Sequence, residues 1–335
     1  MTAVTPETSA DGDEPLVSAL IPTYNRAEFV EGAVETVLGQ THDTIEAVVV
    51  NDGSTDDTRE RLDAYADHDR VRVFHNDENR GIAYTFNRAA EEAAGDYYCI
   101  LGDDDRWAPH KVEKQLDVFE RAGPDLGVVY TWGVETQGGR VTQVIDHETS
   151  GDLFPEMLGS WEVGYHSSHM LRRACFESVG GFDTSLPRGV DWDMCIRIAR
   201  EWEFAYVPEY LTKRQLHGDN VSVGGGTTDV TSMIREKYAD ELAANPEVAR
   251  QFAARTHFLR AYRGVRSAER GRRDTLAQAV RAFRLDPSVS AALLLGLSLA
   301  GPTVAGTAFT AKEWLTARRN AGVDAEWALG GEPTT

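Results

Sequence analysis

Short apolar runs alternate with helical patterns over the first 131 residues, and this alternation constrains the fold more than any other feature. Between the runs, apolar residues at helical spacing predict helices, for example over 28–39 and 82–94. Strands that alternate with helices through short loops predict an open α/β sheet with right-handed crossovers. The runs themselves are rich in β-branched and aromatic residues and predict five strands, at 16–21, 45–50, 71–74, 97–101 and 126–131.

Three polar loops follow three of these strands, where ligands bind in open α/β sheets. They span 22–26, 52–54 and 103–105, and the last consists of Asp103, Asp104 and Asp105. Clustered carboxylates repel one another unless they share a cation or a donor. Mg²⁺ and Mn²⁺ take such oxygens together with substrate phosphates. The triplet alone also fits a solvated acidic turn, but three loops on one rim favour a nucleotide pocket. The sequence has no G-x-G-x-x-G or P-loop motif, so neither a dinucleotide site nor a P-loop is predicted.

The overall charge is strongly negative, with 54 acidic against 34 basic residues and a net charge of −20. A protein of this charge is not expected to bind nucleic acid, because phosphate attraction needs a positive surface. An acidic surface suits a salt-rich cytoplasm, so we expect a halophilic protein. Three cysteines without metal spacing indicate a reduced, cytoplasmic chain. The polar segment 1–14 has no signal-peptide pattern and is expected to be disordered.

The middle of the chain is less regular. Strands are predicted at 140–145, 163–171 and 204–211, and a short helix at 173–179. Asp191 and Asp193 precede an apolar helical run, where a carboxylate can simply favour the helix N-terminus. His217 lies in the polar loop after the last predicted strand, and a lone histidine in such a loop is more often structural than a ligand.

Taken in order, these segments resemble the family 2 glycosyltransferases, which are inverting enzymes of the GT-A fold that use nucleotide-sugar donors. The resemblance covers about residues 15–222. It implies a GT-A domain over 15–225, in which helices flank a mixed sheet. A helical C-terminal region over 226–335 is expected to follow. The matching segments are 17–26, 49–56, 79–81, Asn87, 95–97, 103–105, 180–183 and 191–193.

The resemblance also implies a role for each matching residue. Asp104 corresponds to the ligand of Mn²⁺ or Mg²⁺ on the donor diphosphate, with Asp105 as a helper and His217 as the loop histidine that completes the metal site. Asp191 corresponds to the catalytic base. The sequence departs from the family pattern at Gly102, where the acidic cluster usually begins, and at Val190, which replaces a glutamate. The implied nucleotide-sugar site consists of Pro22, Thr23, Tyr24, Arg26, Asp52, Gly53, Asn79 and Asp103, with Asp52 on the base and Asp103 near the ribose.

The expected reaction is transfer of a sugar, from UDP-sugar by preference, to a glycan or polyprenyl-phosphate-linked acceptor. Such a step belongs to the assembly of cell-surface polysaccharide or glycoprotein glycans. A nucleotidylyltransferase of the same fold would carry a glycine-rich basic loop after the first strand, and 22–26 is not one. A non-catalytic nucleotide-sugar-binding module is the other alternative, and the presence of both Asp104 and Asp191 argues against it.

The C-terminal third is predicted to be helical from residue 231, with helices over 233–244 and 248–265. About ten arginines lie between Arg250 and Arg284, against the trend of the chain. They form either a solvated helix face or a surface for membrane headgroups or a phosphorylated acceptor. The uncharged run 288–311 is long enough to span a bilayer but is interrupted at Gly301 and Pro302. Peripheral or re-entrant contact on the inner face of the membrane, a soluble packing helix and a true span all remain open.

Overall fold

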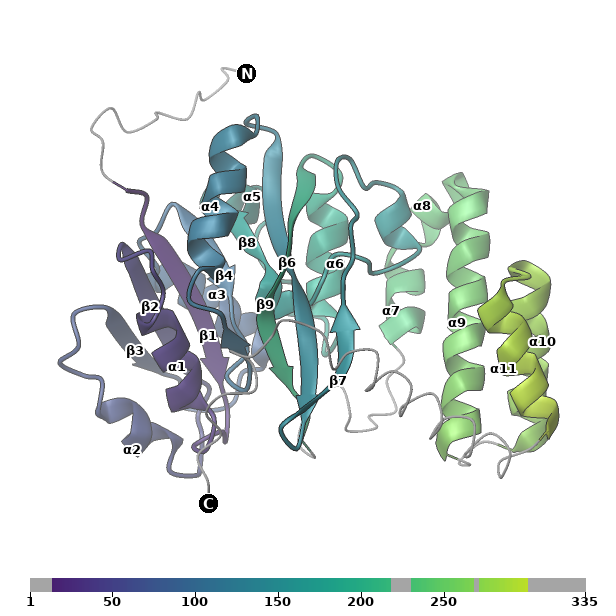
Figure 1. Ribbon diagram of the computed structural model, residues 1–335, viewed down its shortest axis with the longest axis horizontal. Coiled ribbons are helices and arrows are strands. Elements are labelled where there is room, and N and C mark those ends of the chain that lie inside the picture. The colour runs from purple at the N-terminus through teal and green to yellow at the C-terminus, as the bar shows by residue number, and fades with distance from the viewer. Residues whose placement is uncertain (1–13, 218–229, 268–270, 301–335) are drawn as a thin grey trace.

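The computed structural model describes residues 14–217, 230–267 and 271–300, so all but the last residue of the predicted disordered lead lies outside the described residues. A nine-stranded mixed sheet forms the centre of the molecule, with helices against both faces (Figure 1). The spatial order is β3-β2-β1-β4-β8-β6-β9-β5, and β7 pairs with β6. The strands are β1 (Val17–Thr23), β2 (Ile45–Asn51), β3 (Val71–His75), β4 (Tyr97–Ile100), β5 (Arg106–Trp107), β6 (Leu126–Gln137), β7 (Arg140–Ile145), β8 (Met170–Arg172) and β9 (Glu203–Gln215).

The helices connect these strands and then continue alone toward the C-terminus. Two short 3-10 turns, η1 (Glu156–Leu158) and η2 (His166–Ser168), interrupt the long connection between β7 and β8. The α-helices are α1 (Val30–Leu38), α2 (Thr58–Asp63), α3 (Ile82–Glu92), α4 (Lys111–Arg121), α5 (Arg173–Ser178), α6 (Val190–Ile198), α7 (Val230–Lys237), α8 (Ala239–Ala244), α9 (Pro246–Ser267), α10 (Arg272–Leu285) and α11 (Val289–Ala300).

The four strands β3, β2, β1 and β4 are parallel to one another, as the alternation of strands and helices predicts. Every residue of β1 and β2 is buried, because helices cover both faces of this part of the sheet. Ala19 and Ile21 belong to the core that includes residues of α1 and α4, whereas Leu20 between them belongs to the core that includes residues of α3. The carboxyl ends of these strands therefore meet at one rim.

The other half of the sheet differs from the sequence prediction in three places. The predicted strand over 163–171 is wrong for its first part: only β8 is extended, and the chain before it turns through Gly164, whose φ is +74°, into η2. Strands β6 and β9 are longer than predicted and pair in parallel along most of their length. The two-residue strand β5 was not predicted, and it pairs with β9 beside the acidic triplet.

Ser54 and Thr55 precede the helix that carries Leu62, but neither residue caps it. Helix α2 begins at Thr58 and has no side-chain cap. The Ser54 hydroxyl instead accepts a hydrogen bond of 2.8 Å from the backbone N–H of Asn25 in the loop after β1. Ser54 therefore holds two rim loops together.

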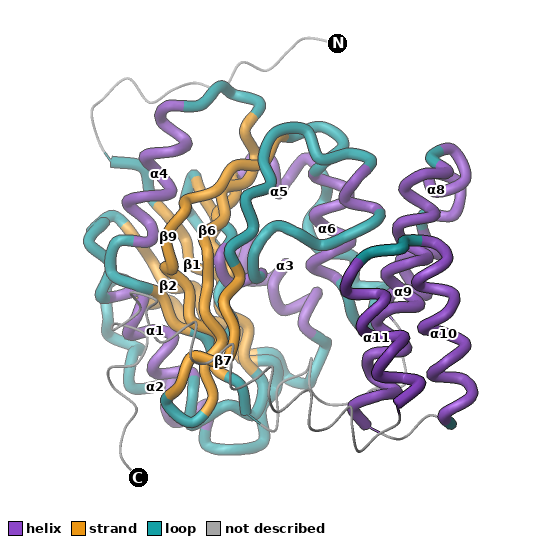
Figure 2. Tube along the Cα trace, turned by 45° about the vertical axis from the view of Figure 1, so that its right-hand side comes forward, coloured by secondary structure: helices purple, strands orange, loops and turns teal. Residues whose placement is uncertain are grey.

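The C-terminal helices pack in two groups. Ile234, Leu242 and Phe252, from α7, α8 and α9, join the core beneath α3 and α6. Helices α9, α10 and α11 form a bundle at one end of the molecule, around the small core of Ala261, Ala279 and Leu294 (Figures 1 and 2). The predicted single helix over 233–244 is wrong, because α7 and α8 are separate. Within the described ranges, no helix has both the length and the apolar character needed to cross a membrane; part of the 288–311 run lies beyond them.

Candidate active site

The three predicted rim loops contact one another in the structure. The Asn25 side-chain oxygen accepts a 2.8 Å hydrogen bond from the backbone N–H of Thr55, and the Asp52 N–H donates to the Thr23 carbonyl at 2.8 Å. Arg26 Nε lies 3.9 Å from Asp103 Oδ1, which joins the first loop to the acidic triplet. The sequence prediction that these loops converge is confirmed.

Asp52 is buried and organises the loop after β3. Its Oδ1 accepts hydrogen bonds from Asn76 Nδ2 at 2.6 Å and from the Arg80 N–H at 2.9 Å, and its Oδ2 accepts one from the Gly81 N–H at 2.9 Å. The neighbouring Gly53 has a φ of +69°, and a Cβ there would lie 2.9 Å from the backbone nitrogen of Asn79. Only glycine fits this close approach.

The remaining predicted nucleotide contacts lie on the first loop, directly after the buried strand β1. Pro22 and Thr23 are buried at the end of β1, whereas Tyr24 is 42% exposed. An exposed aromatic ring between a buried strand and a partly buried arginine can stack on a planar ligand. Asn79, in the loop between β3 and α3, is also exposed.

The acidic triplet follows β4 and is largely buried. Burial, and next the negative charge of Asp104, raise the pKa of Asp103 to about 7 and that of Asp105 to about 8. The Ser167 hydroxyl donates to Asp105 Oδ2, while Asp105 Oδ1 is buried and accepts no hydrogen bond from the described residues. Such a cluster is short of positive charge and of donors.

Asp104 and His217 form a pair, although they are 113 residues apart. His217 Nε2 lies 2.9 Å from Asp104 Oδ2, and both side chains are mostly buried. The His217 ring stacks on Phe29, with centroids 4.4 Å apart and planes 17° apart. This stacking holds the imidazole at the edge of the acidic triplet.

These residues fit a divalent ion that arrives with a diphosphate. Among the residues that the structure describes, no three His, Cys, Asp or Glu side chains form a metal-binding group by themselves. Mg²⁺ and Mn²⁺ in phosphate sites are held by one or two carboxylates while the substrate supplies further oxygens. The Asp104–His217 pair and the unpartnered Asp105 oxygen match that ligand type. The Asp104 and Asp105 side chains lie close to each other, because a Cβ on Gly102 would lie 3.2 Å from Asp104 Oδ1 and 3.2 Å from Asp105 Oδ2.

Asp191 lies in the first turn of α6, which begins after Gly189 at a φ of +70°. Its Oδ1 accepts a 2.9 Å hydrogen bond from the Trp192 N–H. Burial raises the pKa of Asp191 above its usual range, against the opposing effect of this bond and of the Arg214 charge. A carboxylate with a raised pKa accepts a proton more readily, which suits a base.

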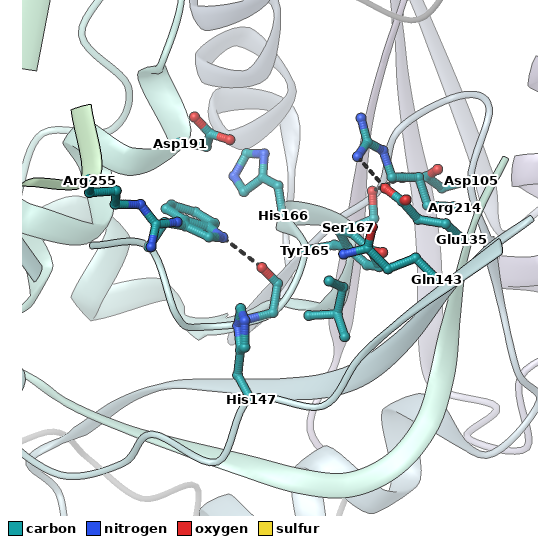
Figure 3. Close-up of a pocket in the computed structure, with 13 residues that line it drawn as sticks. Asp105, Glu135, Gln143, His147, Tyr165, His166, Ser167, Asp191, Arg214 and Arg255 are labelled. Carbon is teal, nitrogen blue, oxygen red and sulfur yellow. Dashed lines mark hydrogen bonds and ion pairs between the residues drawn. The ribbon is translucent and has the colours of Figure 1, made fainter. Parts of the chain in front are cut away.

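One cavity of about 530 Å³ is lined by both Asp105 and Asp191. Figure 3 shows Asp105, Glu135 and Arg214 on one side, Arg255 on the other, and Asp191 with His166 between them. The other lining residues are Gln143, Ile145, His147, Trp161, Gly164, Tyr165 and Ser167.

Several of these residues were not predicted from the sequence. Ser167 holds Asp105 and also accepts a 3.0 Å hydrogen bond from the Gly102 N–H. Arg214 pairs with Glu135 at 2.8 Å and lowers the pKa of both Asp105 and Asp191 through its charge. Their segments carried no motif; only the polar character of the segment after the predicted strand 204–211 pointed to Arg214.

His166 is the imidazole beside Asp191. Its Nε2 is buried without a hydrogen-bond partner among the described residues, and burial lowers its pKa to about 3. The ring therefore stays neutral and can offer one nitrogen to a bound molecule. His169, three residues later, is also buried, and its Nε2 lies 2.6 Å from the Val163 carbonyl.

Asp193 lies two residues after Asp191 but has a different environment. It is fully buried and contacts Arg197 at 2.9 Å, Lys237 at 2.5 Å and the Tyr238 hydroxyl at 2.7 Å. These contacts join α6 to the C-terminal helices. Asp193 is therefore structural.

Residues 18–180 match the sequence profile of glycosyl transferase family 2. Chondroitin synthase of Escherichia coli is 33% identical over 211 residues, which is 62% of this chain and 30% of the synthase. Hyaluronan synthase of Pasteurella multocida is 32% identical over 212 residues, 62% of this chain and 21% of that enzyme. The chain thus spans about a third or less of these two relatives.

Two solved structures have a similar fold. Staphylococcus aureus TarS 1–349 in complex with UDP-GlcNAc superposes with a TM-score of 0.62 at 16% identity, over 87% of this chain and 89% of that one. The mannosyltransferase PcManGT of Pyrobaculum calidifontis, in complex with GDP-Man and Mn²⁺, has a TM-score of 0.52 at 19% identity, over 95% and 81% of the two chains. The matched segment and the fold support a family 2 glycosyltransferase with a GT-A fold.

Proposed function

We propose that the chain is an inverting glycosyltransferase that moves a sugar from a nucleoside diphosphate donor to an acceptor hydroxyl. One observation carries the proposal: a single cavity is lined by Asp105, next to the Asp104–His217 pair, and by the partly buried Asp191. A donor diphosphate beside the acidic triplet and an acceptor hydroxyl beside Asp191 can therefore share one space.

The donor would bind at the rim of the sheet. Tyr24 offers an exposed ring to the base, and Asp52, in a loop fixed by three hydrogen bonds, lies next to it as the base contact. Asp103, held near Arg26, would contact the ribose, and Arg26 the diphosphate. Asn79, packed above Gly53, completes this site. We propose UDP-sugar as the donor, which agrees with the UDP-GlcNAc complex of TarS.

Asp104 and His217 would hold Mn²⁺ or Mg²⁺, with the free oxygen of Asp105 close by. When bound, the ion would neutralise the diphosphate charge that develops as the sugar leaves. PcManGT, which has a similar fold, was solved with Mn²⁺. Without a cation, buried carboxylates at this spacing take up protons, as the raised pKa values of Asp103 and Asp105 indicate.

Asp191 would act as the base. It accepts the proton of the acceptor hydroxyl while that oxygen attacks the anomeric carbon, and the bond from this carbon to the diphosphate oxygen breaks. Attack opposite the leaving group inverts the anomeric centre in one step. The charge of Arg214 lowers the pKa of both Asp105 and Asp191, and so opposes the rise that burial causes.

The acceptor would be a glycan or a lipid-linked glycan. The two relatives named above are polysaccharide synthases, which supports a role in polysaccharide or glycan assembly. The reaction requires only that a free hydroxyl reaches Asp191 through the cavity.

A donor screen tests this proposal. Thermal unfolding is measured with UDP, GDP and dTDP sugars, with and without Mn²⁺, on the wild type and on Asp104→Asn. We expect one UDP-sugar to raise the Tm of the wild type only when Mn²⁺ is present. In Asp104→Asn this Mn²⁺-dependent rise in Tm should be absent. Slow hydrolysis of the same donor would separate an enzyme from a binding module, and consumption of sugar 1-phosphate with UTP would show a nucleotidylyltransferase instead.

We also propose that the C-terminal bundle rests on an anionic membrane surface on the cytoplasmic side. The outward face of α11 is apolar, with Val289 at 87%, Leu293 at 62% and Leu299 at 56% exposure, and α10 contributes the exposed Arg281 and Arg284. We expect the protein to sediment with vesicles of phosphatidylglycerol and to stay in solution with vesicles of phosphatidylcholine. Substitution of Leu293 by Glu should abolish this binding; equal binding of that variant would contradict the proposal.

A further inference from the structure

The far end of the cavity has a chemistry that the transfer reaction itself does not require. Arg255 reaches it from α9, which lies outside the segment that matches the family profile. Trp161 and His147, from the long connection between β7 and β8, line the same end. Figure 3 shows that this end is opposite Asp105 and Arg214, with Asp191 between them.

The charge of Arg255 is poorly matched by the protein. Its guanidinium lies 3.9 Å from the exposed Glu162 carboxylate and makes no hydrogen bond to the described residues. By contrast, Arg250 on the same helix makes two hydrogen bonds to Glu247, at 2.5 and 3.0 Å. An exposed ion pair at the longer distance contributes little. Arg255 is therefore a half-exposed guanidinium that can form a bidentate pair with an incoming anion.

Trp161 and His147 beside it are held rigidly. The indole stacks on His169, with centroids 5.6 Å apart and planes 22° apart, and its Nε1–H donates to the Gly164 carbonyl at 2.6 Å. His147 Nδ1 accepts a 3.1 Å hydrogen bond from the Gly164 N–H, so its other ring nitrogen carries the proton when the ring is neutral. Burial lowers the pKa of His147 and favours that neutral form. A fixed indole and a ring N–H donor suit a sugar ring with polar substituents.

We propose that the end of the cavity formed by Trp161, His147 and Arg255 is an acceptor subsite for a sugar that carries an anionic group, a carboxylate or a phosphate. The inference rests on the proposed function, because it assigns the acceptor side of the same cavity. The anion binds at Arg255 and the sugar ring packs on Trp161. A carboxylate at Asp191 repels the anion, so the anion stays at Arg255 and a hydroxyl is directed to Asp191.

Binding of three matched probes to the full chain tests the proposal. Methyl glucuronide, glucose 6-phosphate and neutral methyl glucoside share one sugar ring, and saturation-transfer NMR measures their affinities with and without UDP. We expect one or both charged probes to bind about tenfold more tightly than the glucoside, since hydrogen bonds between charged groups contribute that much. The stronger of the two identifies the anion as carboxylate or phosphate. Equal binding of all three probes would overturn the inference.

Variants locate the effect. Arg255→Ala should remove the preference for charged probes, and Glu162→Gln should strengthen it, because a competing carboxylate is lost. Arg273→Ala removes an equal charge from an exposed position of α10 and should leave the preference intact. A preference that survives in Arg255→Ala would refute the assignment. UDP binding is measured on the same samples: a chain that binds UDP without charge preference contradicts only this inference, whereas failure to bind any nucleotide contradicts the proposed function.

Discussion

Replacement of Asp191 by Asn tests the assignment of the base with the smallest structural change. The Asn side-chain oxygen can accept the same hydrogen bond from the Trp192 N–H that Asp191 Oδ1 accepts at 2.9 Å. Burial raises the pKa of Asp191, which means that the protein disfavours its negative charge. A neutral amide at this position should therefore leave the thermal stability unchanged or slightly higher.

The expected loss of activity follows from the chemistry. An amide cannot take the proton of the acceptor hydroxyl, and a positioned base contributes about 10²- to 10⁴-fold to the rate. This corresponds to about 3 to 5 kcal/mol of transition-state stabilisation. We expect kcat to fall by that factor while the affinity for UDP stays the same, because Asp191 lies away from the nucleotide loops.

The pH dependence of the wild type has a definite sign. As the pH falls through the raised pKa of Asp191, the carboxylate takes up a proton and can no longer act as a base, so kcat decreases on the acid side. The residual activity of Asp191→Asn should lack this decrease. Rates are measured from UDP release at saturating donor between pH 4.5 and 8, with Tm recorded at each pH.

Two results would refute the reasoning. Near wild-type kcat in Asp191→Asn would exclude Asp191 as the base. A large drop in Tm, with activity lost in proportion to the unfolded fraction, would show that Asp191 is structural, as expected for Asp193 but not for Asp191.

Three further predictions concern neighbouring residues. Asp193→Asn should lower the unfolding free energy by about 3 kcal/mol, because the fully buried Asp193 loses its charged contacts with Arg197 and Lys237, while kcat per folded molecule stays constant; urea unfolding measures this. Burial lowers the pKa of Lys111 to about 8, so between pH 8 and 10.5 the unfolded chain binds a proton that the folded chain does not. The stability of the wild type relative to Lys111→Met should therefore rise by about 3 kcal/mol over that range. A constant difference in stability would contradict the lowered pKa. His217→Ala should raise the Mn²⁺ concentration for half-maximal activity about tenfold or more, since Asp104 loses its partner; an unchanged Mn²⁺ titration would remove His217 from the metal site.

The parallel half of the sheet was predictable because its signal is local. Strands β1 and β2 are buried on both faces, so their sequences are almost continuously apolar. Polar loops come directly after these strands in the sequence, and in a parallel sheet the carboxyl ends of the strands lie at the same edge. The acidic triplet and Asp52 were therefore found from their positions after strands.

The other side of the cavity depends on contacts between distant segments. Ser167 holds Asp105 from 62 residues away, and Arg255 reaches the cavity from α9. Neither residue carries a sequence motif, and η2 was predicted as part of a strand because its neighbours are apolar. The chain turns at Gly164 because this residue has a positive φ, and the pattern of apolar residues in the sequence does not predict that conformation.

The departure at Gly102 has a structural explanation in the same contacts. A Cβ at this position would lie 3.2 Å from carboxylate oxygens of Asp104 and Asp105 and 3.4 Å from the Ser167 hydroxyl. A carboxylate in place of Gly102 would add a fourth negative charge where burial already raises the pKa of Asp103 and Asp105. The glycine instead lets its N–H donate to Ser167, which in turn donates to Asp105. Ser167 thereby fixes one oxygen of Asp105, and the other oxygen accepts no hydrogen bond from the described residues. Asp104, Asp105 and His217 therefore remain available for the divalent ion that we propose, although the sequence lacks the acid at position 102.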